Sequence, residues 1–243
     1  MQIKLFEKVE EAMSEFFDPR GNSISKDEFV HFYSECYYLY CSDVVEREIE
    51  EYLKSDGKIT SPMDVMKILE WKLGRINYKK SQTIKTTCYK HPDLMQQFVT
   101  QTRSGKINAK KICEHIARNY DSLSKMSPEE ILEELKADNV ENLGSVYLIT
   151  LIYFITKGEY PIFDRFAQMA VSAIVNDKEP GSYIPQTDLP SRTSKNIIEK
   201  CNEIYVNPLK SVFQDEYKID RNIDRALWVY GHLFESDKSK ANF

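Results

Sequence analysis

Residues 140–167, VENLGSVYLITLIYFITKGEYPIFDRFA, decide how the chain can fold. Nearly every position from 145 to 156 is apolar. A helix that is apolar on all sides is buried on all sides, and this one is too short to span a bilayer, which takes about 20 apolar residues. We therefore predict a central helix in a single compact body that comprises residues 1–243.

The composition is that of an ordinary globular protein. Of the 243 residues, 42% are apolar and 29% are charged, which argues against a disordered chain. Eight glycines and nine prolines are few for an all-β protein of this length. The first 20 residues are amphipathic and acidic without the apolar core of a signal peptide, and the five cysteines are scattered. We predict an all-α, cytoplasmic protein with no membrane partner.

Three serines mark helix starts. Ser25 stands three residues before Glu28, as in a capping box, and Ser61 and Ser127 each precede a proline at the first helical position. Further helices are expected at residues 2–17, 43 to about 53, 194–205, 208–216 and 223–234, with a loop at 176–195. These elements form an N-terminal helical lobe (1–120), a hairpin region (121–175) and C-terminal helices (176–243).

Two of the expected helices carry aromatic side chains on one face. In the helix after Ser25 we assign this face to the core rather than to a stacking platform; it comprises Phe29, Phe32, Tyr33, Cys36, Tyr37 and Tyr40. In the last helix Trp228 and His232 are four residues apart and share a side. A lone histidine in that position is typical of a structural role.

Residues 71–111 differ in charge from the rest of the chain. They contain ten lysines and arginines and a single acid, Asp93, in a chain whose net charge is −5. Such a segment is either a solvated face or an electrostatic footprint for phosphates. As DNA contacts from this segment we predict Lys72, Arg75, Lys79 and Lys80.

Four residues offer an alternative use of the same region as a zinc site. Cys88 and His91 have the spacing of a ligand pair, and Cys113 and His115 lie further along the chain. However, Cys113 and His115 fall in an expected helix capped by Asn108, where residues two apart do not share a face. We therefore predict no metal and no other cofactor.

The start of the central helix carries a family resemblance. Residues 140–144 resemble the Leu-Pro-Gly-Val-Gly turn of the helix-hairpin-helix DNA glycosylases of base-excision repair. Val140 and Leu143 match the two apolar positions and Gly144 the final glycine, while Glu141 replaces the proline. Asn142 stands at the first glycine, where a left-handed backbone is tolerable for asparagine.

A second resemblance follows downstream. Residues 160–164, Tyr-Pro-Ile-Phe-Asp, resemble the family's extended piece that ends in its essential aspartate. The resemblance covers roughly residues 127–175 and implies a two-lobed helical bundle. It implies a phosphate site at Asn142, Gly144 and Ser145, and Asp164 as the catalytic carboxylate at a flipped-out base. Asp164 is also read as an ordinary N-cap that accepts from the amide of Phe166 or Ala167.

The chain departs from the family at the lysine nucleophile. That lysine lies two residues after the final hairpin glycine, where this chain has Val146, and Lys157 lies at the other end of the helix. The four closely spaced cysteines of the iron–sulfur relatives are also absent from the sequence. The resemblance therefore implies monofunctional hydrolysis of an N-glycosidic bond in duplex DNA. The alternative is a non-catalytic module on the same scaffold that binds nucleic acid or protein.

Overall fold

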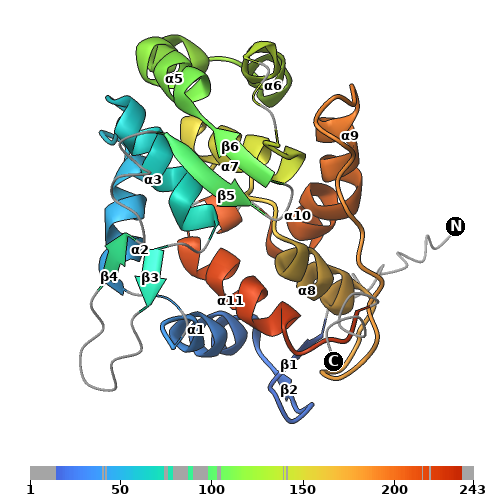
Figure 1. Cartoon of the computed structure of the whole chain (residues 1–243). Coiled ribbons are helices and arrows are strands. Elements are labelled where there is room, and N and C mark those ends of the chain that lie inside the picture. The colour runs from blue at the N-terminus through green and yellow to red at the C-terminus, as the bar shows by residue number, and fades with distance from the viewer. Residues whose placement is uncertain are drawn as a thin grey trace, which may run out of the picture.

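The computed structural model describes residues 15–236 except 40, 42, 74–75, 79–86, 90–97, 103–104, 139, 141, 215 and 219. This part of the chain is mostly helical, as predicted (Figure 1). The central helix is confirmed as α7 (Ser145–Ile155), in which nine of the eleven residues are buried. It packs against α3 (Pro62–Lys72) and α6 (Pro128–Ala137).

The predicted capping signals do begin helices. Ser25, Ser61 and Ser127 are the N-caps of α1 (Lys26–Tyr37), α3 and α6, and each forms a reciprocal capping box with the acid at the third helical position. The other α-helices among the described residues are α2 (Asp43–Glu50), α5 (Lys110–Leu123), α8 (Arg165–Val175), α9 (Ile197–Cys201), α10 (Asn207–Phe213) and α11 (Arg221–Gly231). Two 3-10 turns are η1 (Glu51–Leu53) and η3 (Glu216–Lys218).

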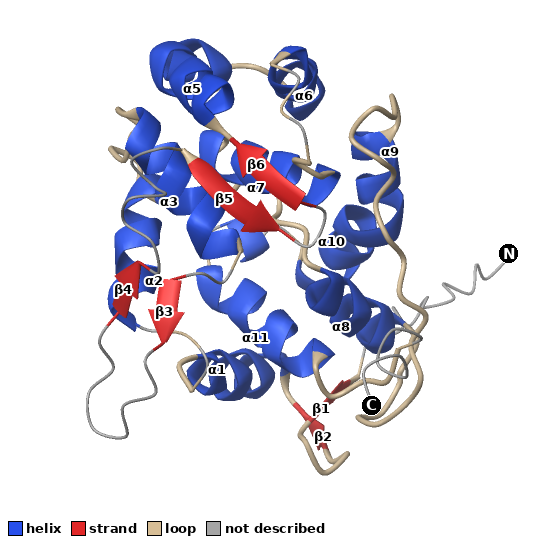
Figure 2. Cartoon of the chain, in the orientation of Figure 1, coloured by secondary structure: helices blue, strands red, loops and turns tan. Residues whose placement is uncertain are grey.

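Short antiparallel hairpins accompany the helices (Figure 2). They pair β1 (Phe16–Phe17) with β2 (Ser23–Ile24), β3 (Ile76–Tyr78) with β4 (Thr87–Tyr89), and β5 (Val99–Thr102) with β6 (Gly105–Asn108). The helix predicted for residues 2–17 is therefore wrong at its end, and residues 2–14 lie outside the described part. The physical reason is Asp18, whose carboxylate accepts from the amides of Arg20 (2.8 Å) and Asn22 (2.9 Å) and closes a turn.

The two helices predicted at 194–205 and 208–216 form one continuous run. α9 passes through a π-helical segment, η2 (Asn202–Val206), into α10, which ends at Phe213. Pro208 has no amide to donate, and the wider π turn instead lets the amide of Asn207 reach the carbonyl of Asn202. The loop predicted before this run is confirmed, apart from one bridge between Tyr183 and Glu235.

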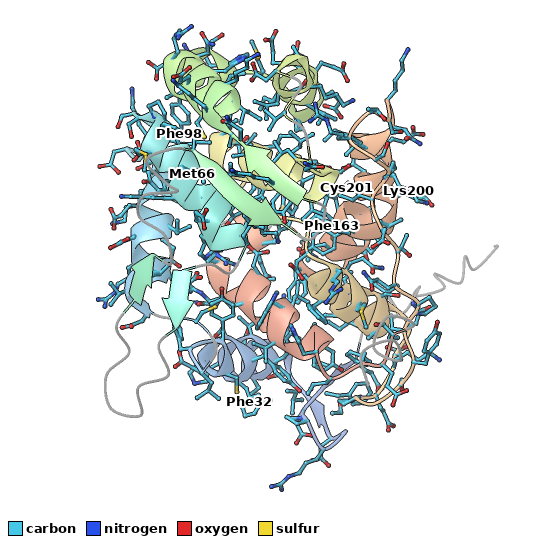
Figure 3. All side chains as sticks on the ribbon, viewed as in Figure 1. Phe32, Met66, Phe98, Phe163, Lys200 and Cys201 are labelled. Carbon is cyan, nitrogen blue, oxygen red and sulfur yellow. The ribbon has the colours of Figure 1, made fainter. Side chains whose placement is uncertain are left out.

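The last helix returns to the first. α11 packs against both α1 and α8, while α5 and α6 lie at the opposite end of the molecule from α1 (Figure 1). The aromatic face of α1 is buried at Phe29, Tyr33 and Tyr37, as predicted, but Phe32 is 44% exposed and points away from the body (Figure 3). Tyr40 lies outside the described residues. No helix in the described ranges is long and apolar enough to cross a membrane.

Candidate functional site

The turn before α7 has the backbone expected of it. Asn142 adopts φ +60°, the left-handed conformation predicted at this position. Val140 and Leu143 are buried, which fixes the turn in the core. The side-chain amide of Asn142 donates to the carbonyl of Lys106 (2.9 Å), so the turn is attached to β6 of the basic segment.

Within the described part of the chain, no acceptor faces the first backbone amides of α7, which suits them to bind an anion. Gly144 is the N-cap and has no side chain to satisfy the amides of Ser145 and Val146, which lack an intrahelical acceptor. The φ of Gly144 is −74°, and a Cβ added there would have no described neighbour within 4 Å. Neither backbone strain nor packing therefore requires glycine at this position. The hydroxyl of Ser145 is buried and donates to the carbonyl of Pro190, so only its amide remains for an anion.

Asp164 is the N-cap of α8, as one reading of the sequence predicted. Its Oδ1 accepts from the amide of Phe166 at 2.9 Å. Its Oδ2 accepts from the Lys72 ammonium, 3.0 Å away, which also donates to the carbonyl of Phe163 at 3.1 Å. Phe163 anchors this end of α8, because its ring is buried and packs edge-on against Tyr205 with centroids 5.6 Å apart (Figure 3).

The surroundings of Asp164 keep its carboxylate charged. Burial by itself would raise the pKa of Asp164, but the Lys72 charge, the Phe166 amide and, more weakly, His232 lower it below its ordinary value. Burial lowers the pKa of His232 from its ordinary value. The side chains of Asp164 and Lys72 are 24% and 10% exposed, so the carboxylate stays accessible to solvent.

Lys72 was predicted to contact DNA phosphate, and the structure places it in an ion pair with Asp164 instead. The reason is its position at the last residue of α3, which packs against α7 and brings Lys72 to the start of α8. Arg75, Lys79 and Lys80 lie outside the described residues. Sequence reasoning missed the pair because no pattern links positions 72 and 164.

An aromatic stack lies beside Asp164. The Phe166 ring stacks on His232 with centroids 3.5 Å apart, and the Arg165 guanidinium lies 4.5 Å from the Phe166 centroid. Trp228 and His232 share a side of α11, as predicted, with centroids 4.2 Å apart. His232 Nδ1 is 2.7 Å from the Trp228 carbonyl, which agrees with a structural role. Gly231 allows α11 to approach the backbone of Phe166 closely, since a Cβ at position 231 would lie 1.9 Å from the Phe166 carbonyl oxygen.

A buried ionic cluster lies behind the Lys72–Asp164 pair, and sequence reasoning did not find it. Glu46 of α2 is 1% exposed and accepts hydrogen bonds from the Tyr37 hydroxyl and Trp71 Nε1, both at 2.7 Å. Arg221 and Arg225 of α11 lie 3.5 and 3.4 Å from the same carboxylate. The sequence does contain a signal that could have revealed this cluster, namely charged residues on otherwise apolar faces of the helices.

The residues of the alternative zinc site are not brought together where the structure describes them. Cys113 is fully buried in the core, whereas His115 lies 3.1 Å from Asp138 and links α5 to the end of α6. His91 and the side chain of Cys88 lie outside the described part. Within that part no three potential ligands cluster around a metal position.

Lys157 is directed away from Asp164. At the far end of α7, its ammonium donates to the carbonyl of Ser55.

Comparisons with protein-family models, curated proteins and solved structures return no match. The function of this chain is therefore inferred from its own residues and their geometry.

Proposed function

We propose that this protein binds duplex DNA and hydrolyses the N-glycosidic bond of a modified base, with Asp164 as the catalytic carboxylate. The observation that carries the proposal is the Asp164 side chain, which is charged, partly open to solvent and fixed at a helix start. Such a carboxylate suits the positive charge that develops on a deoxyribose as its base departs.

The turn before α7 supports the DNA-binding half of the proposal. A left-handed Asn142 and a side-chain-free Gly144 leave the amides of Ser145 and Val146 for a phosphate oxygen. The turn and Asp164 occur in the chain order that resembles the helix-hairpin-helix glycosylases. In this scheme the turn holds the backbone while the flipped base reaches Asp164.

In the proposed reaction water is the nucleophile. The carboxylate of Asp164 orients the water and stabilises the sugar cation, and the departing base takes up a proton. Lys72 supplies a competing nucleophile, since its amine lies 3.0 Å from the Asp164 carboxylate. An attack by that amine on the sugar would give an imine that borohydride traps.

The test is a screen of base release over duplexes that carry different lesions. On a lesion that the wild type processes, Asp164→Asn should reduce release by about 10²–10³-fold, because it removes the charge and keeps the cap. The variant should still fold because asparagine keeps the cap, with a lower melting temperature because the nearly buried Lys72 ammonium loses its counter-charge. Unchanged release by a folded Asp164→Asn would remove Asp164 from the mechanism. Borohydride trapping that Lys72→Gln abolishes would replace water with Lys72.

A non-catalytic binding module is the second candidate, and one observation favours it. The Lys72 ammonium neutralises Asp164 internally, which is also what a purely structural cap would show. The two candidates separate if duplex DNA binds while no lesion in the screen loses its base. That result would support the module.

A further inference from the structure

The Lys72 side chain is more buried and makes more polar contacts than is expected for the last residue of a helix. Lys72 is the last residue of α3, where helices fray, and a lysine side chain has about 2 kcal/mol of rotamer entropy to lose. Its side chain is nevertheless only 10% exposed, with its ammonium fixed between Asp164 and the Phe163 carbonyl. The neighbouring residue, Trp71, explains how the end of the helix is fixed.

Trp71 is held from three directions. Its Nε1–H donates to Glu46 at 2.7 Å, and the Arg221 guanidinium lies 5.3 Å from its ring centroid. Its ring also packs edge-on against Phe154 of α7, with centroids 5.6 Å apart at 90°. These contacts restrain the indole, and with it the end of α3 that continues into Lys72.

Glu46 is the centre of this arrangement. It is almost fully buried, and its carboxylate lies within 3.5 Å of Arg221 and Arg225, which also contact Asp224 and Glu50. A buried ion cluster of this kind commonly stabilises a fold no better than apolar side chains of the same size. What it does supply here is a directional acceptor for the Trp71 indole.

We infer that Glu46 is a positioning residue that acts through the Trp71 indole to hold the Lys72 ammonium against Asp164. The inference rests on the proposed function for its catalytic meaning, while the positioning itself can be measured without substrate. Loosening Trp71 lets Lys72 leave Asp164, and the carboxylate then loses the main charge that keeps it ionised.

Two variants that each remove one donor to Glu46 are compared, and Trp71→Phe also replaces the bicyclic indole with a smaller ring. Trp71→Phe removes the indole donor, and Tyr37→Phe removes a hydroxyl donor; both bonds are 2.7 Å long and end on the same Glu46 oxygen. Only the first donor is joined by the backbone to Lys72. Replacement of Trp71 by benzothienylalanine, which keeps the bicyclic shape without the N–H, serves if Trp71→Phe does not fold.

The readout is ¹⁵N NMR of lysine side-chain ammonium groups, with the Lys72 signal assigned by its loss in Lys72→Met. We expect Trp71→Phe to shift or broaden the Lys72 signal and to raise the pKa of Asp164 by about one unit, whereas Tyr37→Phe leaves both unchanged. Equal effects from the two variants, or none from either, would overturn the inference and leave Glu46 with a structural role alone.

Base release then separates this inference from the proposed function. On a processed lesion, Trp71→Phe should shift the acid limb of the pH–rate profile upward by about one unit, and Tyr37→Phe should not. If the Lys72 signal responds as expected but no lesion is processed, the positioning stands and the glycosylase proposal fails. If release is intact and the Lys72 signal is indifferent to Trp71→Phe, the inference fails and the proposed function stands.

Discussion

At the scale of single residues, Asp224 is a buried acid whose charged form the fold disfavours. Burial raises its pKa to about 6, against the opposing charges of Arg221, Lys72 and Arg225. Its nearest polar partners, the Tyr153 hydroxyl and the Arg221 guanidinium, are both 3.5 Å away. The folded state therefore favours the neutral form of the Asp224 carboxyl group more than the unfolded state does.

This predicts a pH-dependent gain from Asp224→Asn. Because the folded pKa of Asp224 lies above the unfolded value, its contribution to stability is complete below pH about 4 and is lost by pH about 6. The shift of roughly two units corresponds to about 3 kcal/mol. Asparagine does not titrate, so the unfolding free energy of the variant minus that of wild type should rise by up to this amount across the window. Denaturant melts at several pH values measure it, and a flat difference would show that Asp224 titrates normally.

Gly231 makes a prediction that opposes helix propensity. Alanine should stabilise an exposed helix by about 1 kcal/mol, but a Cβ at this position would meet the Phe166 carbonyl oxygen at 1.9 Å. We expect Gly231→Ala to lower the free energy of unfolding by about 1–3 kcal/mol and to disturb the Asp164 cap, whose donor is the Phe166 amide. Gly144→Ala is the control, because its Cβ enters open space; equal melting temperatures for the two variants would contradict the packing argument.

At the scale of elements, α7 is the helix on which the others depend. Phe154 is fully buried and lies edge-on to Trp71 and Tyr153. We expect Phe154→Ala to reduce the free energy of unfolding by about 3–5 kcal/mol, because a cavity opens where α3 and α7 meet. Val146→Ala, half-buried on the same helix, should cost less. Chemical denaturation measures both, and a loss below about 1 kcal/mol for Phe154→Ala would show that α7 is not central.

The elements also show what local sequence can and cannot predict. The starts of α1, α3 and α6 follow from serine–acid capping boxes, which need only neighbouring residues. The left-handed Asn142 and the Asp164 cap are local in the same sense. The Lys72–Asp164 pair and the Glu46 cluster join elements that meet only after the chain has packed. The β1–β2 hairpin was missed because aromatic residues at helical spacing also suit a short strand.

At the scale of the whole molecule, the basic segment of residues 71–111 stands against an acidic total charge. Where it is described, it meets the α7 turn at Lys106, whose carbonyl receives the Asn142 amide. This hydrogen bond joins the basic segment to the α7 turn, although the two lie far apart along the chain. This is the arrangement on which the DNA proposal depends.

If the proposal holds, duplex binding should weaken steeply with salt. Each phosphate contacted releases counterions, so the logarithm of the affinity should fall against the logarithm of salt with a slope of about −0.9 per contact. Fluorescence anisotropy between about 50 and 200 mM salt measures the slope. Duplex affinity too weak to measure at low salt would reject the DNA partner.

The loop of residues 176–196 also has a consequence for handling the protein. Hydrogen bonds attach its backbone to three other parts of the chain. The Pro190 carbonyl accepts from the Ser145 hydroxyl, and the Ser194 carbonyl accepts from the Lys136 ammonium (2.8 Å). The Ile184 amide donates to the carbonyl of Glu235 (3.0 Å). A protease can bind a segment of this loop in its active site only after these hydrogen bonds have broken. We therefore expect trypsin to cleave the native protein slowly after Arg192 and Lys195, which flank the bonds at Pro190 and Ser194.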